Sequence, residues 1–193
     1  MPRPLRVDFP GAWHHVMNRG ADHRDIFEHD ADYGVFFDAL ASAIDRSNLE
    51  VHAYCLMTNH FHLLVRSQDG RLASGMQFLL GRFTRLINLR VGRDGPLFRG
   101  RYSSVLVESD GQLVQACRYI HLNPVAAGMT SRSEAWPWSS AAAYSGATQP
   151  PPWLKTEFVM DLFGPGDRMS AYREFLAAGA DRSTLDFYAG IGW

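Results

Sequence analysis

The stretch "LEVHAYCLMTNHFHLLVR" (residues 49–66) reads as a β-hairpin that carries two unusual histidines. Two apolar runs flank residues 58–59, a Thr-Asn turn pair in which Asn tolerates left-handed backbone angles. Because residues i and i+2 of a strand face the same side, His60 and His62 share one face and Phe61 points to the other. Two imidazoles in an otherwise apolar strand are either hydrogen-bonded polar residues on an open sheet face or ligands of a metal ion. The spacing alone leaves both interpretations open.

The hairpin lies within a regular alternation of strands and helices. Helices are predicted where apolar residues recur at helical spacing, and strands where short apolar runs end at turn residues. The order β-α-β-β-α-β-α predicts an α+β, ferredoxin-like (split βαβ) fold, with a four-stranded antiparallel sheet and two helices on one face. The seventh element is a candidate to cover the other face. The predicted strands are 12–19, 49–57, 60–66 and 101–108, and the predicted helices are 30–47, 70–92 and 109–123.

The ends of these helices have recognisable signals. Asp30 is expected to be the N-cap of the first helix, and Ser109 or Asp110 that of the last. Pro124 is expected to end the last helix, because the residue before a proline is biased away from helical angles.

The chain divides near Gly128 by composition. Residues 1–128 hold the predicted fold, and residues 129–193 form a C-terminal extension rich in Pro, Ser, Ala and Trp, with a short helix predicted at 168–179. The extension is expected to wrap the first domain and to offer DNA contacts. Its tryptophans either stack on DNA bases or anchor the extension by apolar packing, since the segment has little other apolar material. They are Trp136, Trp138 and Trp153.

Composition excludes several classes of protein. No stretch approaches the ~20 apolar residues of a membrane span. No apolar region follows the N-terminal charges, so no signal peptide is expected and the cytoplasm is the expected location. Cys55 and Cys117 are too few for a disulfide framework and lack zinc-pair spacing, which favours buried free thiols.

The net charge of −1 hides a basic segment. Residues 71–101 contain seven arginines and one acid, Asp94, and Lys155 is the single lysine of the chain. The arginine guanidinium forms bidentate hydrogen bonds with phosphate and stacks on bases. The segment therefore favours binding to a polyanion such as a nucleic acid. The alternative is a set of plain surface charges. The arginines proposed for DNA phosphates are Arg19, Arg82, Arg85, Arg99 and Arg101.

The last predicted helix carries a further pair of polar side chains. Tyr119 and Asn123 are four residues apart, so they are neighbours on one face, one turn from each other. The pair offers a phenol nucleophile beside an amide oxygen able to bind a metal. A half-buried tyrosine with a solvated hydroxyl is the plainer interpretation, and the spacing does not exclude it.

Four motifs in order make the chain similar to the single-tyrosine HUH transposases, and most of all to the REP-associated tyrosine transposases. The resemblance covers roughly residues 12–138. It departs from the family pattern at Thr58, where proline is typical, and at Ala126, where a basic residue is common. The motifs are "WHHVMNRGADHRDIF" (13–27), "YCLMTNHFHLLV" (54–65), "GPLFRGRYSSVLV" (95–107) and "YIHLNPVAAG" (119–128).

The resemblance implies a catalytic domain at 1–128 and a role for each motif residue. His60, His62 and Asn123 match the ligands of Mg²⁺ or Mn²⁺, and Tyr119 matches a nucleophile that attacks single-stranded DNA to form a 5′-phosphotyrosyl link. The implied substrate is single-stranded or hairpin DNA, which the protein would cleave and rejoin as a metal-dependent endonuclease and transesterase. His14 and His15 are expected to be structural residues of the first strand and not metal ligands.

Two other functions stay open on this fold. One is a nucleic-acid-binding regulator without catalytic activity. The other is a metal-dependent phosphohydrolase in which water is the nucleophile and Tyr119 has no catalytic role. A monomer is expected, because the extension would occupy the surface that a partner needs; insertion-sequence relatives form dimers with exchanged tyrosine helices, so a dimer is the alternative.

Overall fold

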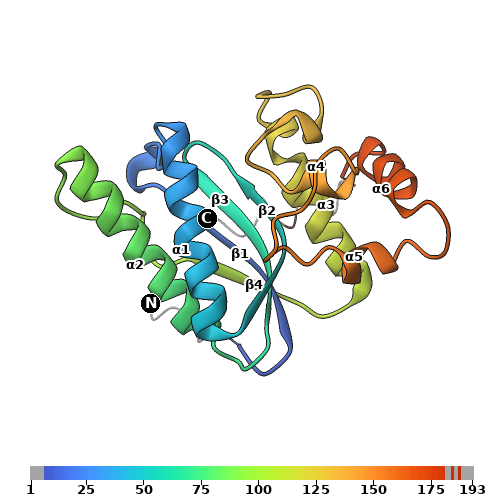
Figure 1. Cartoon of the computed structure of the whole chain (residues 1–193), viewed down its shortest axis with the longest axis horizontal. Coiled ribbons are helices and arrows are strands. Elements are labelled where there is room, and N and C mark those ends of the chain that lie inside the picture. Colours follow the sequence, from blue (N-terminus) through green and yellow to red (C-terminus); the bar gives the residue numbers. More distant parts are fainter. Residues whose placement is uncertain (1–6, 181–183, 185–186, 188–193) are drawn as a thin grey trace.

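A four-stranded antiparallel sheet is the centre of the structure, a computed structural model that describes residues 7–180, 184 and 187. Its order is β2-β3-β1-β4, and every neighbouring pair is antiparallel, as the predicted ferredoxin-like topology requires. A helix leads from each inner strand to an edge strand: one connects β1 to β2 and the other connects β3 to β4 (Figure 1). The strands are β1 (Ala12–Arg19), β2 (Leu49–Leu56), β3 (His60–Ser67) and β4 (Ser103–Val107).

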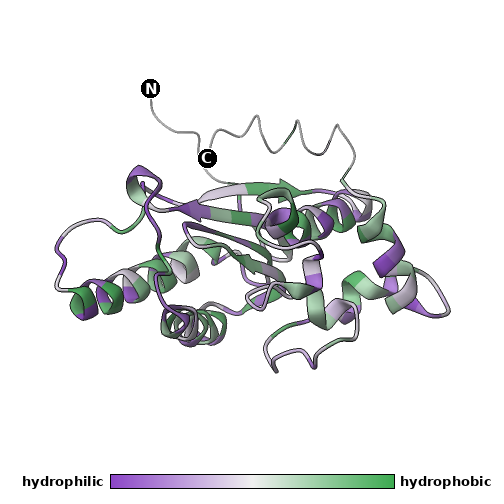
Figure 2. Ribbon diagram, turned by 90° about the horizontal axis from the view of Figure 1, so that it is seen from above, coloured by the Kyte–Doolittle hydropathy of each residue, from purple (hydrophilic) through white to green (hydrophobic). Residues whose placement is uncertain are grey.

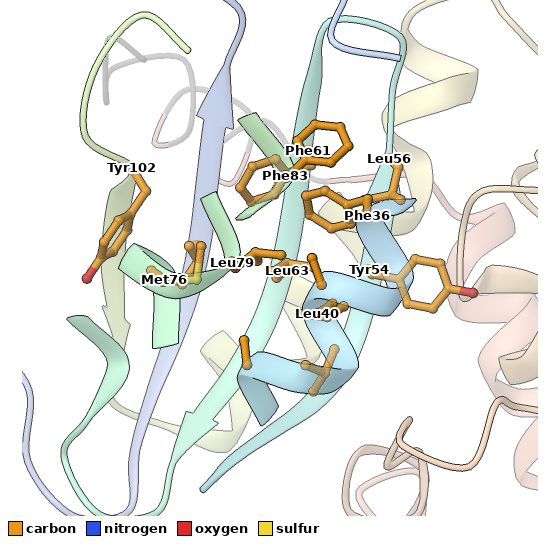
Figure 3. Close-up of a cluster of buried hydrophobic side chains, with 14 of the residues drawn as sticks. Phe36, Leu40, Tyr54, Leu56, Phe61, Leu63, Met76, Leu79, Phe83 and Tyr102 are labelled. Atoms are coloured by element: carbon orange, nitrogen blue, oxygen red, sulfur yellow. The ribbon is translucent and has the colours of Figure 1, made fainter. Parts of the chain in front are cut away.

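Helices α1 (Asp30–Ser47) and α2 (Leu72–Val91) cover one face of the sheet. Phe61 points into this layer and meets Phe36 and Phe83, with 5.1 Å between the Phe36 and Phe61 ring centroids. Figure 3 shows these rings together between the strands and the two helices. This arrangement confirms that Phe61 faces the helices and leaves the histidines beside it on the opposite face.

Helix α3 (Asp110–Ala126) covers the opposite face, where it forms a second core with residues of the C-terminal extension. Met17 and Leu64 from the sheet are fully buried there against Cys117 of α3. Apolar residues run through the strands at the centre of the molecule (Figure 2). The prediction that the seventh element lies on the open face is therefore confirmed, and Cys55 and Cys117 are buried free thiols, as expected.

The described part of the extension packs on the β2 edge of the sheet. Backbone bridges join Val51 to Leu154 and Cys55 to Ser139, so part of this edge is paired. Trp138 stacks on Tyr33 with 4.1 Å between ring centroids. Trp136, Trp138 and Trp153 all pack against core clusters, which supports the packing interpretation of these side chains. The short elements here are η2 (Ser133–Ala135), α4 (Ala141–Tyr144), α5 (Glu157–Asp161) and α6 (Arg168–Ala177).

Two predicted helix ends are wrong. Helix α3 continues through Pro124 to Ala126, because the turn around Pro124 still supplies helical bonds: the amide of Ala127 donates to Asn123 and that of Met129 to Pro124. Proline removes one donor, and the buried Pro124 is followed by backbone bonds that continue the helix. The N-cap position of α1 is His29 rather than Asp30; Asp32, in the first turn, accepts the backbone N–H of His29 at 2.9 Å. Ser109 caps α3, as one of the two expectations has it.

No helix of the described residues is long and apolar enough to cross a bilayer. Part of the N-terminal segment behind the expectation of no signal peptide, residues 1–6, lies outside the described residues. The same holds for most of the extension beyond residue 180.

Candidate active site

His60 and His62 open β3 with their rings side by side. Their centroids are 5.1 Å apart and the ring planes are perpendicular. Each ring uses Nδ1 for a hydrogen bond within the protein: His60 Nδ1 lies 2.7 Å from Asn59 Oδ1, and His62 Nδ1 lies 2.9 Å from His15 Nε2. A metal ion would therefore bind both rings through Nε2. Partners of this kind fix the orientation of ligating histidines.

Helix α3 brings Tyr119 and Asn123 to the two rings. The Tyr119 ring lies edge-on to His62, with 5.7 Å between ring centroids. Asn123 Nδ2 donates to the backbone carbonyl of Tyr119 at 2.8 Å. An interaction with the Asn123 side chain acts to raise the pKa of His60 and of His62, against the larger effect of burial. Because Nδ2 is bonded to the Tyr119 carbonyl, the amide oxygen is the Asn123 atom left to serve a cation beside the histidines.

Burial sets the protonation of this cluster. It lowers the pKa of His60 to about 4, with Arg19 contributing a further decrease, and it lowers the pKa of His62 well below the ordinary value. Burial also raises the pKa of the Tyr119 hydroxyl. At neutral pH the site therefore holds neutral imidazoles, the form that binds metals, and a protonated phenol.

The available donor atoms suit a divalent cation that accepts both nitrogen and oxygen ligands. Within residues 7–180 and at 184 and 187, no group of three or more His, Cys, Asp or Glu side chains forms a metal site. The residues that could hold a cation here are His60 and His62, through two imidazole nitrogens, and Asn123, through its amide oxygen. Mn²⁺ and Mg²⁺ accept carbonyl oxygens and keep positions for water and phosphate, and imidazole suits the transition metals. The set fits Mn²⁺ best on these grounds.

A strained turn supports the first histidine. In η1 (Ala21–His23), Asp22 and His23 both have left-handed backbone angles, with φ of 53° and 59°. Such angles are uncommon for residues other than glycine and persist where surrounding contacts hold them. Asn59 Nδ2 donates to the carbonyl of His23 at 3.2 Å, and Asn59 in turn contacts His60. The turn therefore fixes Asn59, and Asn59 orients His60.

The predicted DNA-binding arginines separate into two groups. Arg19 is the register partner of His60, and Arg99 donates its backbone N–H to the Arg19 carbonyl at 2.9 Å. Arg101 follows Gly100, whose carbonyl accepts from the side chain of Asn18 in β1. Arg19, Arg99 and Arg101 thus belong to the end of the sheet where β3 begins.

Arg82 and Arg85 do not join this group. Both are exposed on α2, in the helix layer on the other face of the sheet from α3. Two further arginines of the basic segment are neutralised, since Arg90 pairs with the buried Asp32 and Arg93 pairs with Glu28 at 3.4 Å. The segment is therefore less basic than its composition indicates.

A buried polar network anchors α3 to the extension. His121 Nδ1 lies 2.6 Å from the hydroxyl of Tyr172 in α6, and its Nε2 lies 2.6 Å from Ser140 Oγ. Ser140 in turn bonds the backbone of Tyr54 in β2 at 2.8 Å. His121 therefore ties the helix to the sheet edge and the extension, on a different side of α3 from Tyr119.

Sequence reasoning missed two residues of the site. His15 was assigned to the strand alone, yet it contacts both His62 and Tyr119. Strand alternation carried a signal, because Trp13, His15 and Met17 share one face of β1. Asn59 was read only as a turn residue, and nothing in its spacing indicates that its side chain contacts His60.

Comparisons with known proteins give the family and the fold of the chain. Residues 9–123 match the family described as "Transposase IS200 like". A Haemophilus influenzae protein named as a REP-associated tyrosine transposase is 27% identical over 116 residues, which are 54% of this chain and 66% of that protein, slightly under two thirds of its length. The solved structure of a REP-associated tyrosine transposase bound to a REP hairpin superposes with a TM-score of 0.66 at 16% identity, over 80% of this chain and 92% of that one. The last comparison shows the fold.

Proposed function

Because the chain belongs to the IS200-like transposase family, we propose that it is a metal-dependent single-stranded DNA endonuclease and transesterase. It cleaves and rejoins hairpin-forming repeat DNA through a covalent bond to Tyr119. The observation that carries the proposal is the position of the Tyr119 ring, 5.7 Å from His62 between ring centroids. The REP hairpin bound by the structural relative supports hairpin DNA as the substrate class.

Tyr119 supplies the nucleophile. Its phenol oxygen attacks the phosphorus of a phosphodiester, the bond from phosphorus to the 3′ oxygen breaks, and a 5′-phosphotyrosyl bond forms. The phenol proton is lost and the leaving 3′ oxygen gains one, so a free 3′-OH results and charge balances. Burial raises the pKa of Tyr119, so the phenol must lose its proton as it attacks. The covalent bond keeps the energy that rejoining needs, which hydrolysis would lose.

His60, His62 and Asn123 would hold Mg²⁺ or Mn²⁺, through two imidazole nitrogens and one amide oxygen. A divalent cation in such a site withdraws charge from the non-bridging phosphate oxygens and orients in-line attack. The protein prepares the site by keeping both imidazoles neutral and by fixing each ring through Nδ1. Less reorganisation is then required when DNA binds.

Arg19, Arg99 and Arg101 would contact DNA phosphates. Arg19 is the register partner of His60, and backbone bonds hold Arg99 to the same end of β1, so these cations flank the scissile phosphate. Such contacts fix the position of a strand without reading its sequence. For Arg82 and Arg85, exposure on the remote layer of α2 favours plain surface charges.

The division of the chain belongs to the same proposal. Residues 1–128 form the proposed catalytic domain, and residues 129–193 form the extension, whose described part packs against that domain. The His121 network supports this division, because it ties α3 to the extension of the same chain. We propose a monomer whose site is completed by its own helix, and the cytoplasm as its location; the contacts between α3 and the extension of the same chain support the monomer.

The proposal is tested with Mn²⁺ and an end-labelled single-stranded hairpin DNA. The wild type should yield a covalent protein–DNA adduct that survives denaturation, and Tyr119→Phe should lose the adduct while it still binds the hairpin. Cleavage without attachment would indicate a phosphohydrolase that uses water. Binding without cleavage would indicate a silent regulator. An adduct that persists in Tyr119→Phe would exclude this nucleophile.

A further inference from the structure

His15 is a buried side chain that none of the proposed catalytic steps uses. It lies in β1 on the same face as His62, and it is fully enclosed, with 0% of its surface exposed. Its Nε2 is 2.9 Å from His62 Nδ1, a hydrogen-bond distance between two buried ring nitrogens. The His15 and His62 ring centroids are 5.1 Å apart, and the Tyr119 ring lies 5.8 Å from His15. One side chain therefore contacts both a proposed ligand and the proposed nucleophile.

The hydrogen bond between two neutral imidazoles permits only two proton arrangements. Either His62 donates from Nδ1 and His15 accepts at Nε2, or the roles are reversed. In the reversed arrangement the His62 proton is on Nε2, the nitrogen that the metal would need. In the first arrangement His62 Nε2 carries a lone pair toward Asn123 and His60. The direction of this single bond therefore decides whether His62 is able to bind a cation.

We propose that His15 is a positioning residue that accepts the Nδ1–H bond of His62 and so holds His62 in its metal-binding tautomer. This inference rests on the proposed function, because it concerns the same cation site. A histidine takes the place here of the carboxylate or carbonyl that usually accepts from a ligating imidazole. The edge contact with Tyr119 lets the same side chain set the spacing between the phenol and the ligand.

The neighbouring His14 provides a matched control. It belongs to the same strand and is 1% exposed, so it is as buried as His15. Its ring points to the other face of the sheet, where Nε2 bonds Asp8 Oδ1 at 3.2 Å and Nδ1 bonds Ser104 Oγ at 3.1 Å. Replacement of His14 therefore removes a buried imidazole and its hydrogen bonds from β1 without touching His62.

The test measures Mn²⁺ affinity of the full chain, without DNA, by electron paramagnetic resonance of the free ion. Loss of an outer partner of a metal ligand typically weakens affinity by about 10- to 100-fold. We expect His15→Leu to lose affinity in this range and His15→Gln, whose amide oxygen accepts the same hydrogen bond, to stay within a few-fold of wild type. His14→Leu should bind Mn²⁺ as the wild type does. Wild-type affinity in His15→Leu, or an equal loss in His15→Gln, would overturn the inference.

Two further measurements keep the result decisive. Long-range ¹H–¹⁵N spectra of the metal-free wild type should show His62 protonated at Nδ1; protonation at Nε2 would overturn the inference even if His15→Leu does not fold. His60→Ala should lose Mn²⁺ binding. A wild type that binds no Mn²⁺, or a His60→Ala variant that binds it fully, would overturn the metal site and this inference with it. Failure confined to the His15 variants leaves the proposed function standing.

Discussion

His62 of β3 and Tyr119 of α3 are separated along the chain by α2 and β4, and their rings meet edge-on with 5.7 Å between centroids. The helix that carries Tyr119 is anchored to the same chain by His121, Ser140 and Tyr172. The residues of the proposed site thus meet within a single copy. Exchange of α3 between two copies would require these buried hydrogen bonds to open and to form again with the partner's residues.

A mixture of two inactive variants should therefore stay inactive. Tyr119→Phe retains the metal site and lacks the nucleophile, and His60→Ala has the reverse defect. Because each copy uses its own α3, neither variant supplies the group that the other lacks. The measurement is adduct formation on hairpin DNA in an equimolar mixture, with each variant alone and each mixed with wild type as controls. Adduct recovered on mixing would demonstrate a site shared between copies.

Asn123 should control metal affinity through its oxygen. Asn123→Ala removes that ligand, and we expect Mn²⁺ affinity to fall by about 10-fold or more, or at least about 1.4 kcal/mol. Asn123→Asp puts a charged oxygen at the same place and should bind Mn²⁺ more tightly, because ligand charge tunes the affinity of hard cations. Calorimetric titration measures both. Equal affinities in the three proteins would show that the cation does not use this side chain.

The fold was predictable because each element repeats one pattern over its whole length. The alternation in "HFHLLV" separates Phe61 from the histidines, and the helix at 30–47 has the observed bounds. Tyr119 and Asn123 were also predictable as a pair, since four-residue spacing fixes their neighbourhood on any helix. Local spacing is sufficient for features of this kind.

What the sequence did not predict depends on contacts between distant segments. Nothing near Pro124 indicates that packing lets α3 continue to Ala126. The role of His15 depends on the register of β1 against β3, which places its ring at hydrogen-bond distance from His62. Composition also groups Arg82 with Arg99, although the fold puts them in different layers. Such relationships require the arrangement of the chain in space.

The two groups of arginines should differ in their contribution to DNA binding. Arg99→Gln should weaken hairpin binding and reduce the slope of log affinity against log salt by about 1, the value for one lost phosphate contact. Arg82→Gln should leave affinity and slope unchanged, because its cation lies on the remote layer. Fluorescence anisotropy over a series of salt concentrations measures both quantities. A larger effect of Arg82→Gln would move the DNA path to α2.

Mild acid should destabilise the metal-free protein. Burial lowers the pKa of His15 and His121 to about 3 and of His52 to about 4, whereas the unfolded chain takes up protons near the ordinary value of 6.5. Between these values the unfolded state binds more protons, so the free energy of unfolding falls as pH decreases. Urea unfolding with a chelator, from pH 7 to pH 4.5, measures this dependence. His52→Gln removes one such group and should make the free energy of unfolding depend less on pH. A wild-type free energy of unfolding that is constant over this range would contradict the prediction.

The network around His121 should contribute measurably to stability. Tyr172→Phe deletes a hydroxyl that lies 2.6 Å from His121 Nδ1 and 3.3 Å from Cys117 Sγ, and it leaves buried polar atoms unsatisfied. We expect the free energy of unfolding to fall by about 1–3 kcal/mol. Tyr33→Phe is the matched control, since the Tyr33 hydroxyl forms no hydrogen bond with any described residue and its buried ring is kept.

The two ends of this network should also be coupled. Ser140→Ala removes the partner of His121 Nε2, and the double variant with Tyr172→Phe should depart from additivity by about 0.5–3 kcal/mol, because both changes act on one imidazole. Chemical denaturation of the four proteins of this cycle gives the coupling energy. Additive losses, or a loss in Tyr33→Phe as large as that in Tyr172→Phe, would mean that α3 is held by apolar packing alone. In that case His121 could be replaced by leucine without a change in the position of Tyr119.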